Sequence, residues 1–289
     1  MKTGTQASVH VVLQGKGGVG KSFVSAILAQ YFRTKAAPVH CLDTDPVNAT
    51  FAQYHALEAE HLKVLRRGTV NEKQFDVLVE KVCHGDGVYI VDTGATTFVP
   101  LWNYILENEI LAFFRTHGRN VFVHSVVTGG QAMSDTLNGL ERLAQTTSEK
   151  NVIVWLNEYF GEVTKDGKTF EEFKVAAEYA PKLVGTVLIR ERNPHTYDHD
   201  VRQMLERRLT FGEAIQNADF SLVSKQRLAI VRREIFEQLD KLAIVSPHAQ
   251  RRRFHRRAAA HRRSCGASQT PSQAGRPCTR PGHDEPAYS

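Results

Sequence analysis

The stretch GKGGVGKS, residues 15–22, decides the fold of this chain. It satisfies G-x-x-x-x-G-K-[ST], the pattern of a loop whose backbone N–H groups surround nucleotide phosphates. The apolar run at 8–14 (SVHVVLQ) predicts a buried strand before the loop, and 23–34 (FVSAILAQYFRT) predicts an amphipathic helix after it. The motif requires a strand, a loop and a helix in this order. The sequence therefore predicts a nucleotide-binding protein.

Each part of the loop has a chemical role in holding phosphate. The glycines let the backbone turn its N–H groups inward, and the helix that follows adds the positive end of its dipole. We expect Lys21 to reach the β- and γ-phosphates and the Ser22 hydroxyl to bind Mg²⁺. The alternative is a glycine-rich turn that only caps a helix. The predicted phosphate-binding residues are Gly15, Lys16, Gly17, Gly18, Val19, Gly20, Lys21, Ser22 and Phe23.

Two apolar runs end in aspartate and predict carboxylates at one edge of a parallel sheet. Residues 38–42 lead into Asp43 and Asp45, and residues 88–91 lead into Asp92. The carboxyl ends of parallel strands are where such sheets bind ligands, and a phosphate-hydrolysing site needs acidic groups for its metal and water. The alternative is that these are ordinary turn aspartates.

Lys16 has no role in the ordinary loop, and two interpretations of it stand side by side. It is either a solvated surface lysine or a cation that reaches a partner's nucleotide in trans. GKGGVGKS resembles the deviant Walker A loop of the ParA/MinD family of P-loop ATPases, which favours the second interpretation. The resemblance implies a homodimer that forms face to face around two ATP molecules, with Lys16 acting catalytically beside Lys21.

The same resemblance assigns roles to the residues at the strand ends. It implies that Asp45 orients the lytic water, that Asp43 lies near the Mg²⁺ shell and that Asn48 makes a polar contact in the first switch. Asp92 is similar to the Walker B aspartate that touches Mg²⁺ through water, and Gly94 belongs to the second switch. These are the catalytic, switch and metal-binding expectations.

Asn157 follows the apolar run 151–156 and lies where the family places an adenine-reading asparagine. A turn residue after a strand is the alternative. This chain departs from the family pattern at Val47, where ParA proteins usually carry Gln, and at 188–191 (LIRE), where a proline is usual. The expectation of ATP rather than GTP therefore depends mainly on the resemblance.

Longer segments resemble the TraL branch of this family, which acts in conjugative plasmid transfer. The likeness spans about 9–245 and includes DTDPVNATF at 43–51, VVTGGQA at 126–132 and RLTFGEA at 208–214. It implies a slow switch ATPase whose partners are conjugation or plasmid-maintenance proteins. The alternatives are an ATPase for plasmid partition or positioning on DNA or membrane, a small metabolic synthetase, and an adaptor that binds ATP without hydrolysing it.

Charge distinguishes residues 1–245 from the C-terminal tail, residues 246–289. The segment 246–289 holds nine Lys/Arg and two Asp/Glu, so residues 1–245 carry a net charge of −1 although the whole chain carries +6. Low aliphatic content predicts a disordered tail, whose basic cluster at 251–263 either binds DNA, RNA or anionic lipid or is incidental. Four cysteines do not form a disulfide framework, and no signal peptide or membrane span is evident. We expect a bacterial cytoplasmic protein, with contact at the inner membrane as an alternative.

Apolar runs alternate with helical patterns throughout 1–245, which predicts one doubly wound α/β domain with a mostly parallel sheet. The expected strands are 9–13, 39–42, 88–91, 121–127, 152–156 and 183–189. The expected helices are 23–34, 100–117, 131–145, 170–179, 197–208 and 222–242. We expect 161–168 to form turns and the last helix to pack on the core rather than bind a membrane.

Overall fold

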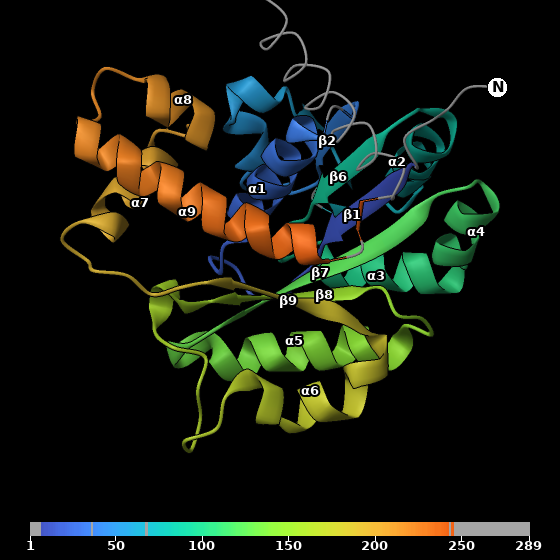
Figure 1. The fold of residues 1–289 in the computed structure, drawn as a ribbon. Coiled ribbons are helices and arrows are strands. Elements are labelled where there is room, and N and C mark those ends of the chain that lie inside the picture. Colours follow the sequence, from blue (N-terminus) through green and yellow to red (C-terminus); the bar gives the residue numbers. More distant parts are fainter. Residues whose placement is uncertain (1–6, 36, 67–68, 243, 246–289) are drawn as a thin grey trace, which may run out of the picture. The chain divides into compact units, whose positions relative to one another are not determined.

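A seven-stranded sheet forms the centre of the protein, in the order β3-β2-β6-β1-β7-β8-β9 (Figure 1). The structure, a computed structural model, describes residues 7–35, 37–66, 69–242 and 244–245, so the predicted tail lies outside the described residues. Each neighbouring pair of strands in this sheet is parallel. The strands are β1 Ser8–Val12, β2 Val39–Asp43, β3 Glu60–His61, β6 Val88–Asp92, β7 Asn120–Thr128, β8 Val152–Asn157 and β9 Leu183–Ile189. The predicted fold class is confirmed.

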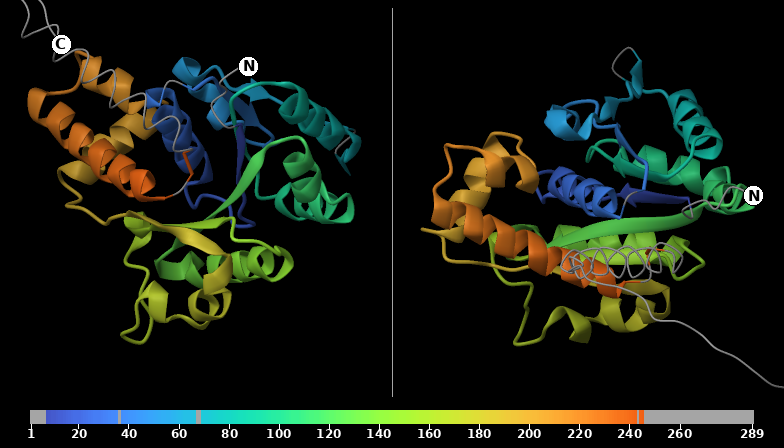
Figure 2. Two further views of the ribbon diagram at one scale, coloured as in Figure 1. Left: turned by 45° about the vertical axis from the view of Figure 1, so that its right-hand side comes forward. Right: turned by 45° about the horizontal axis from the view of Figure 1, so that its top comes forward.

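Helices cover both faces of this sheet, as the two further views in Figure 2 also show. One face packs against α1 Lys21–Thr34, α7 Tyr197–Glu206, α8 Phe211–Gln216 and α9 Leu222–Lys241. The other face packs against α2 Lys73–His84, α3 Phe98–Glu107, α4 Ile110–Thr116, α5 Met133–Thr146 and α6 Lys174–Tyr179. A separate antiparallel pair, β4 Leu65–Arg66 and β5 Thr69–Val70, lies outside the main sheet.

Successive residues of the central strands enter opposite cores, which explains their uninterrupted apolar sequence. In β1, Val12 belongs to the core beneath α1, whereas Val11 belongs to the core beneath α2 and α3. Because β1 lies between β6 and β7, the chain reverses its direction of winding at β1. Open α/β sheets bind ligands at the carboxyl ends of the strands beside such a reversal. The loop after β1 occupies that place.

The two edges of the sheet are closed in different ways. β3 has only two residues, so it offers little backbone for pairing. At the other edge, the side-chain amide of Gln238 on α9 accepts a hydrogen bond from Leu188 N at 2.7 Å and donates one to Leu188 O at 3.0 Å. This amide therefore replaces one residue of a neighbouring strand along β9.

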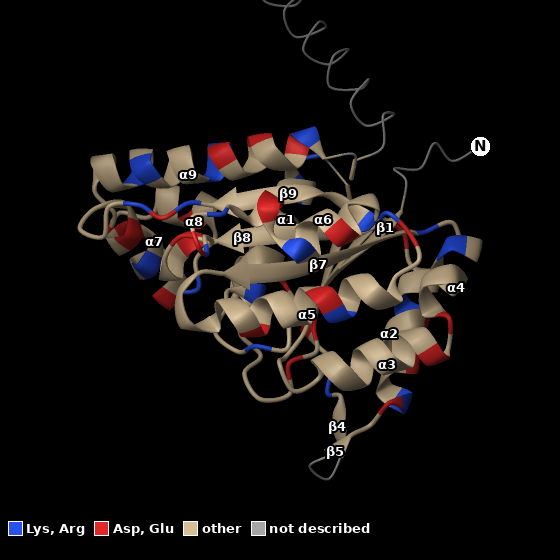
Figure 3. Ribbon diagram, turned by 90° about the horizontal axis from the view of Figure 1, so that it is seen from below, with Lys and Arg blue, Asp and Glu red and all other residues tan. Residues whose placement is uncertain are grey.

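The last helix, α9, packs on the core as expected. Its buried side chains include Leu228, Val231, Ile235 and Leu239, which recur every three or four residues. Figure 3 shows Lys and Arg along the first part of α9 and mostly Asp and Glu toward its end. Among the described residues, no helix is long and apolar enough to span a bilayer.

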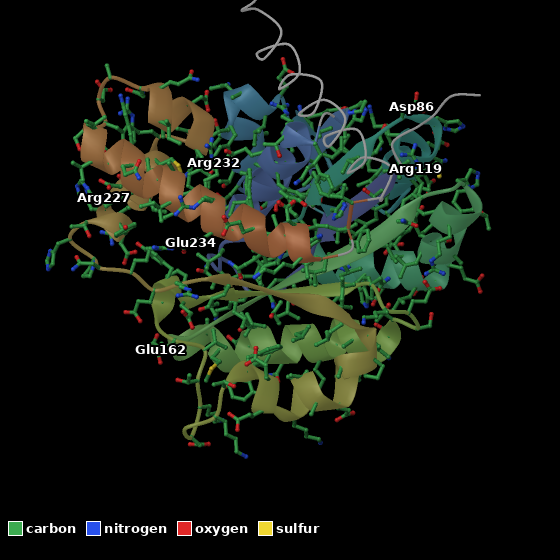
Figure 4. The ribbon with its side chains drawn as sticks, in the orientation of Figure 1. Asp86, Arg119, Glu162, Arg227, Arg232 and Glu234 are labelled. Carbon is green, nitrogen blue, oxygen red and sulfur yellow. The ribbon has the colours of Figure 1, made fainter. Side chains whose placement is uncertain are left out.

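The basic side chains of α9 are partly neutralised within the protein. Arg227 Nε lies 2.5 Å from the buried Asp200 carboxylate of α7, and Glu234 pairs with Arg192. Figure 4 labels Arg227 and Glu234 on α9. Arg233 lies 3.9 Å from Glu237, one turn further along the helix. These contacts favour a solvated helix face that is fixed to α7 over a surface that attracts nucleic acid.

Three details of the expected helices differ from the structure. The expected helix at 170–179 is wrong in its first part, because α6 begins at Lys174 after a 3₁₀ helix at Phe170–Glu172. The single helix expected at 100–117 is wrong, because α3 ends at Glu107 and α4 begins at Ile110. Glu109 between them has a φ of 49°, in the left-handed region. Helices α2 and α8 were not expected at all. The turn-rich excursion at 161–168 is confirmed, since Asp166 and Gly167 both have positive φ.

Candidate nucleotide site

The phosphate loop connects β1 to α1 at the centre of the sheet edge. Gly18 has a φ of 76° and Gly20 a φ of 101°, and residues with a side chain rarely adopt these values. A Cβ on Gly20 would also lie 2.9 Å from Asn157 Nδ2. Both glycines are therefore required by the local geometry, which turns the backbone into the start of α1.

Lys21 is buried at the first position of α1, with 7% of its surface exposed. Its ammonium donates to the carbonyl oxygen of Lys16 at 3.0 Å, across the loop. Burial lowers the pKa of Lys21, and the nearby carboxylates of Asp92 and Asp45 oppose that shift. The side chain is thus already placed within the curve of the loop, where phosphate oxygens would replace the Lys16 carbonyl as its acceptor.

Asp92, at the end of β6, is joined to the first turn of α1 by two hydroxyl groups. Ser22 Oγ donates to one carboxylate oxygen at 2.6 Å, and Ser25 Oγ donates to the other at 2.8 Å. Burial raises the pKa of Asp92 to about 7, and the hydrogen bond from Ser22 opposes the shift. Ser25 was not predicted from the sequence, although it lies one turn after Ser22 on the same helix.

The Ser22 hydroxyl and the Asp92 carboxylate are a donor set that fits Mg²⁺, which prefers oxygen ligands and retains several waters. A fully buried carboxylate also gains most from a nearby cation, because burial disfavours its charge. Within the described residues, no three His, Cys, Asp or Glu side chains gather into a metal cluster. These two residues therefore suit a metal ion whose other ligands are mostly water and phosphate.

In and after the end of β2, Asp45 lines the cavity described below, whereas Asp43 is buried. Asp45 Oδ1 accepts from the backbone N–H groups of Val47 at 2.9 Å and Asn48 at 3.1 Å. Both oxygens of the buried Asp43 accept backbone N–H groups, one from Asp45 and one from Ala52, each at 2.9 Å. Burial raises the pKa of Asp43, and these two hydrogen bonds oppose the shift. Asp43 organises the loop and is not brought to the cavity.

A cavity of about 580 Å³ opens between the phosphate loop and the segments that follow β2 and β6. Its walls also include two residues at the end of α7 and just after it, Leu205 and Arg208. Gly94 lies immediately before two of the lining residues, and a Cβ on it would lie 2.7 Å from Asp45 Oδ1. The lining residues are Gly17, Gly18, Gly20, Lys21, Ser22, Phe23, Asp45, Val47, Asn48, Thr50, Gln53, Tyr54, Ala95, Thr96, Leu205 and Arg208.

A second cavity of about 240 Å³ adjoins the first and contains Asn157. Gly18, Gly20, Phe23 and Leu205 line both cavities. Asn157 Nδ2 donates to Val19 O at 2.9 Å, so this side chain already contacts the phosphate loop. Tyr159, Phe160 and Ile189 also line this smaller cavity.

Lys16 lies outside both cavities. Its ammonium is 2.7 Å from Asp135 Oδ2 in the first turn of α5, and about half of each side chain is exposed. The buried Gln14 fixes the loop to the same region, because its amide donates to Val126 O at 2.9 Å and Thr136 O at 3.0 Å. Gln14 Oε1 accepts from Gly15 N at 2.8 Å. The Lys16 side chain is thus turned away from the chain's own phosphate site.

The sequence that contains this site matches one nucleotide-binding family. The family described as the CobQ/CobB/MinD/ParA nucleotide binding domain matches residues 10–224 of this chain. The chain belongs to this family. Membership in the CobQ/CobB/MinD/ParA family confirms that the phosphate loop belongs to a nucleotide-binding domain.

Two proteins from Escherichia coli, both named Protein TraL, are similar to this member of the CobQ/CobB/MinD/ParA family. One is 42% identical over 240 residues, which are 83% of this chain and 100% of the relative. The other is 41% identical over the same length and the same shares of the two chains. The resemblance to TraL inferred from short segments is confirmed over the length of the relatives.

Solved structures of the same family are similar at low sequence identity. A chain of the MinC:MinD cell division protein complex from Aquifex aeolicus is 14% identical, with a TM-score of 0.47, and the match covers 80% of this chain and 96% of that one. A ParA family ATPase from Chlorobium tepidum TLS is 14% identical, with a TM-score of 0.44, over 78% and 98% of the two chains. The family assignment rests on the sequence matches, not on these scores.

Proposed function

We propose that this protein is a Mg²⁺-dependent ATPase that dimerises on ATP and acts as a slow switch in conjugative plasmid transfer. The observation that carries the proposal is the meeting of Lys21, Ser22 and Asp45 on one cavity, with Asp92 bonded to Ser22 behind it. Phosphate-hydrolysing sites combine a phosphate cradle, a metal site and a group that orients water. The TraL resemblance supports the place in conjugation.

The proposed roles follow the placement of each side chain. The loop N–H groups and Lys21 bind the phosphates, and the Asp45 carboxylate holds the attacking water on the cavity wall. Bound at Ser22 and Asp92, Mg²⁺ would neutralise charge on the phosphate oxygens. Asn157 orients the base in the adjoining cavity.

Lys16 is proposed to act on the partner's nucleotide. Its ammonium lies outside the cavity of its own chain and is about half exposed, so a second copy can approach it. A cation delivered across an interface stabilises the charge of the transferring phosphoryl group. This role couples hydrolysis to dimerisation.

The testing experiment measures ATP turnover and oligomeric mass for the wild type, Lys16→Ala and Asp45→Ala. We expect the wild type to dimerise on ATP, Lys16→Ala to remain monomeric, and Asp45→Ala to dimerise without hydrolysis. Added DNA or anionic vesicles identify the surface that stimulates turnover. Equal turnover in all three proteins as monomers would contradict the switch mechanism, and tight ATP binding with no turnover in any of them would identify an adaptor.

A further inference from the structure

The far wall of the large cavity carries a basic residue that the proposed function leaves without a role. Arg208 follows α7 and lines the same cavity of about 580 Å³ as Lys21 and Ser22. Its backbone has a φ of 53°, a value that is unfavourable for a residue with a side chain. Strained residues of this kind concentrate at functional sites because the surrounding structure holds them in place.

The guanidinium of Arg208 is held by neutral groups. Nη1 donates to Leu205 O at 2.6 Å, and Nε donates to Gln53 Oε1 at 3.1 Å. No carboxylate within the described ranges lies within ion-pair distance of it, whereas the adjacent Arg207 pairs with Asp219 at 2.6 Å. A guanidinium has five N–H donors, so these two contacts leave donors for another acceptor. The charge of Arg208 is therefore uncompensated beside the phosphate loop.

The position of Arg208 along the cavity selects the part of a nucleotide that it faces. Phe23 in the first turn of α1 packs against Phe211, with ring centroids 6.3 Å apart, so the segment after α7 lies beside the start of α1. Leu205, one turn before Arg208, lines both the large cavity and the smaller one that contains Asn157. Arg208 thus lies near the junction between the phosphate cavity and the base cavity.

We propose that Arg208 binds the α- and β-phosphates of the nucleotide, opposite the phosphate loop. This inference rests on the proposed function, since it assumes that the cavity holds a nucleoside di- or triphosphate. Arginine suits the task because its planar fork donates two parallel hydrogen bonds to phosphate oxygens. The contact would fix α7 and α8 to the bound nucleotide, while Gln53 connects the same guanidinium to the segment after Asp45.

The test compares the dissociation constants of ATP and ADP for the wild type, Arg208→Gln, Arg208→Lys and the matched control Arg207→Gln, measured by calorimetry with Mg²⁺. We expect Arg208→Gln to weaken both nucleotides alike, by about 10-fold to 100-fold, because a charge-assisted contact to phosphate is lost. Arg208→Lys keeps the charge and loses less. Arg207→Gln removes an adjacent arginine outside the cavity and leaves both constants within about 2-fold of the wild type.

The outcomes separate this inference from the proposed function. Unchanged constants in Arg208→Gln, with a wild type that binds, overturn the Arg208 contact alone. A loss confined to ATP overturns the assignment to the α- and β-phosphates. If Arg208→Gln fails to fold, equal binding by Arg208→Lys and the wild type at low and high salt refutes the contact, and weaker binding by Arg208→Lys supports it. A wild type that binds neither nucleotide overturns the proposed function itself.

Discussion

The Lys16 ammonium and the Asp135 carboxylate form an ion pair of 2.7 Å that joins the tip of the phosphate loop to the first turn of α5. Lys16 therefore has a partner within its own chain. If Lys16 acts across a dimer, this pair must open before the side chain can cross the interface. The pair is half exposed, so opening it costs little free energy, about 0.2–1 kcal/mol.

Replacing Asp135 with Ala releases Lys16 and is expected to strengthen ATP-dependent dimerisation. Each dimer contains two such pairs, one per subunit, so its dissociation constant should fall by up to about 30-fold, at up to about 1 kcal/mol for each exposed ion pair. Analytical ultracentrifugation with ATP measures it, and Glu141→Ala on the same helix is the control for loss of a partly exposed acidic side chain. A weaker dimer in Asp135→Ala would show instead that Asp135 belongs to the interface.

Replacing Asp92 with Asn should abolish the effect of Mg²⁺ on ATP binding without unfolding the protein. An asparagine side chain can still accept a hydrogen bond from Ser22 or Ser25, but it carries no charge for a cation. We expect Mg²⁺ to raise ATP affinity at least 10-fold in the wild type and less than 2-fold in the variant, on the order of one charged contact. Titrations with Mg²⁺ and with EDTA measure both, and an equal Mg²⁺ effect would exclude Asp92 from the metal site.

Replacing Gly94 with Ala should impair hydrolysis more than binding. The new Cβ would lie 2.7 Å from Asp45 Oδ1, so the carboxylate must move from its place on the cavity wall. We expect turnover to fall by about 10-fold to 100-fold, since small displacements of a catalytic group have effects of this size. Gly212→Ala is the matched control, because its Cβ would have no neighbour closer than 3.9 Å. Normal turnover in Gly94→Ala would show that Asp45 does not need this position.

A buried chain of hydrogen bonds predicts loss of stability in acid. Trp155 Nε1 donates to His124 Nδ1 at 2.9 Å, His124 Nε2 lies 2.9 Å from His10 Nδ1, and His10 Nε2 lies 3.1 Å from Ser8 Oγ. Because the indole only donates, each histidine must be neutral with its proton on Nε2. Burial lowers the pKa of His124 to about 3 and that of His10 well below 6.5.

These lowered pKa values make the folded protein less stable as the pH falls. Unfolding releases histidines that bind protons below pH 6.5, so the stability present above that pH is lost as the pH falls toward 3. At pH 5 the loss that His124 contributes is about 2 kcal/mol, and His10 adds a loss of the same sign. His124→Gln should be less stable than the wild type at pH 7 and closer to it at pH 5, as measured by urea unfolding. A gap of the same size at both pH values would argue against a neutral His124.

The sequence predicted the parts of the fold that depend on local pattern. Six strands of the sheet are long apolar runs, and each was found within about one residue of its expected place. The remaining strand, β3, pairs only two residues, Glu60 and His61, with no apolar run to mark them. The break at Glu109 contains no glycine or proline. Its local signal is Asn108, the C-cap of α3, a residue type that is common at helix ends. Helix α2 did carry a signal that was overlooked, because Phe75, Leu78, Val79 and Val82 have helical spacing.

The candidate site also contains residues that the local sequence predicts and residues that it does not. The phosphate loop has a motif, and Asp45 and Asp92 end recognisable strands. Arg208 reaches the cavity from a segment far along the chain. It begins the TraL-like segment RLTFGEA, but that resemblance did not indicate a contact with the nucleotide. Asp135 gains its contact to the loop, and Gln14 its contact to Thr136, only through the packing of α5 against the sheet. Contacts of this kind depend on tertiary structure, which periodicity and motifs do not encode.

The amide of Gln238 on β9 has a consequence for how copies of this protein can meet. A strand from another molecule that paired along this edge would have to displace both of its hydrogen bonds to Leu188. Exposed strand edges are the usual route to uncontrolled aggregation. One glutamine on a helix thus discourages polymerisation through the edge of the sheet.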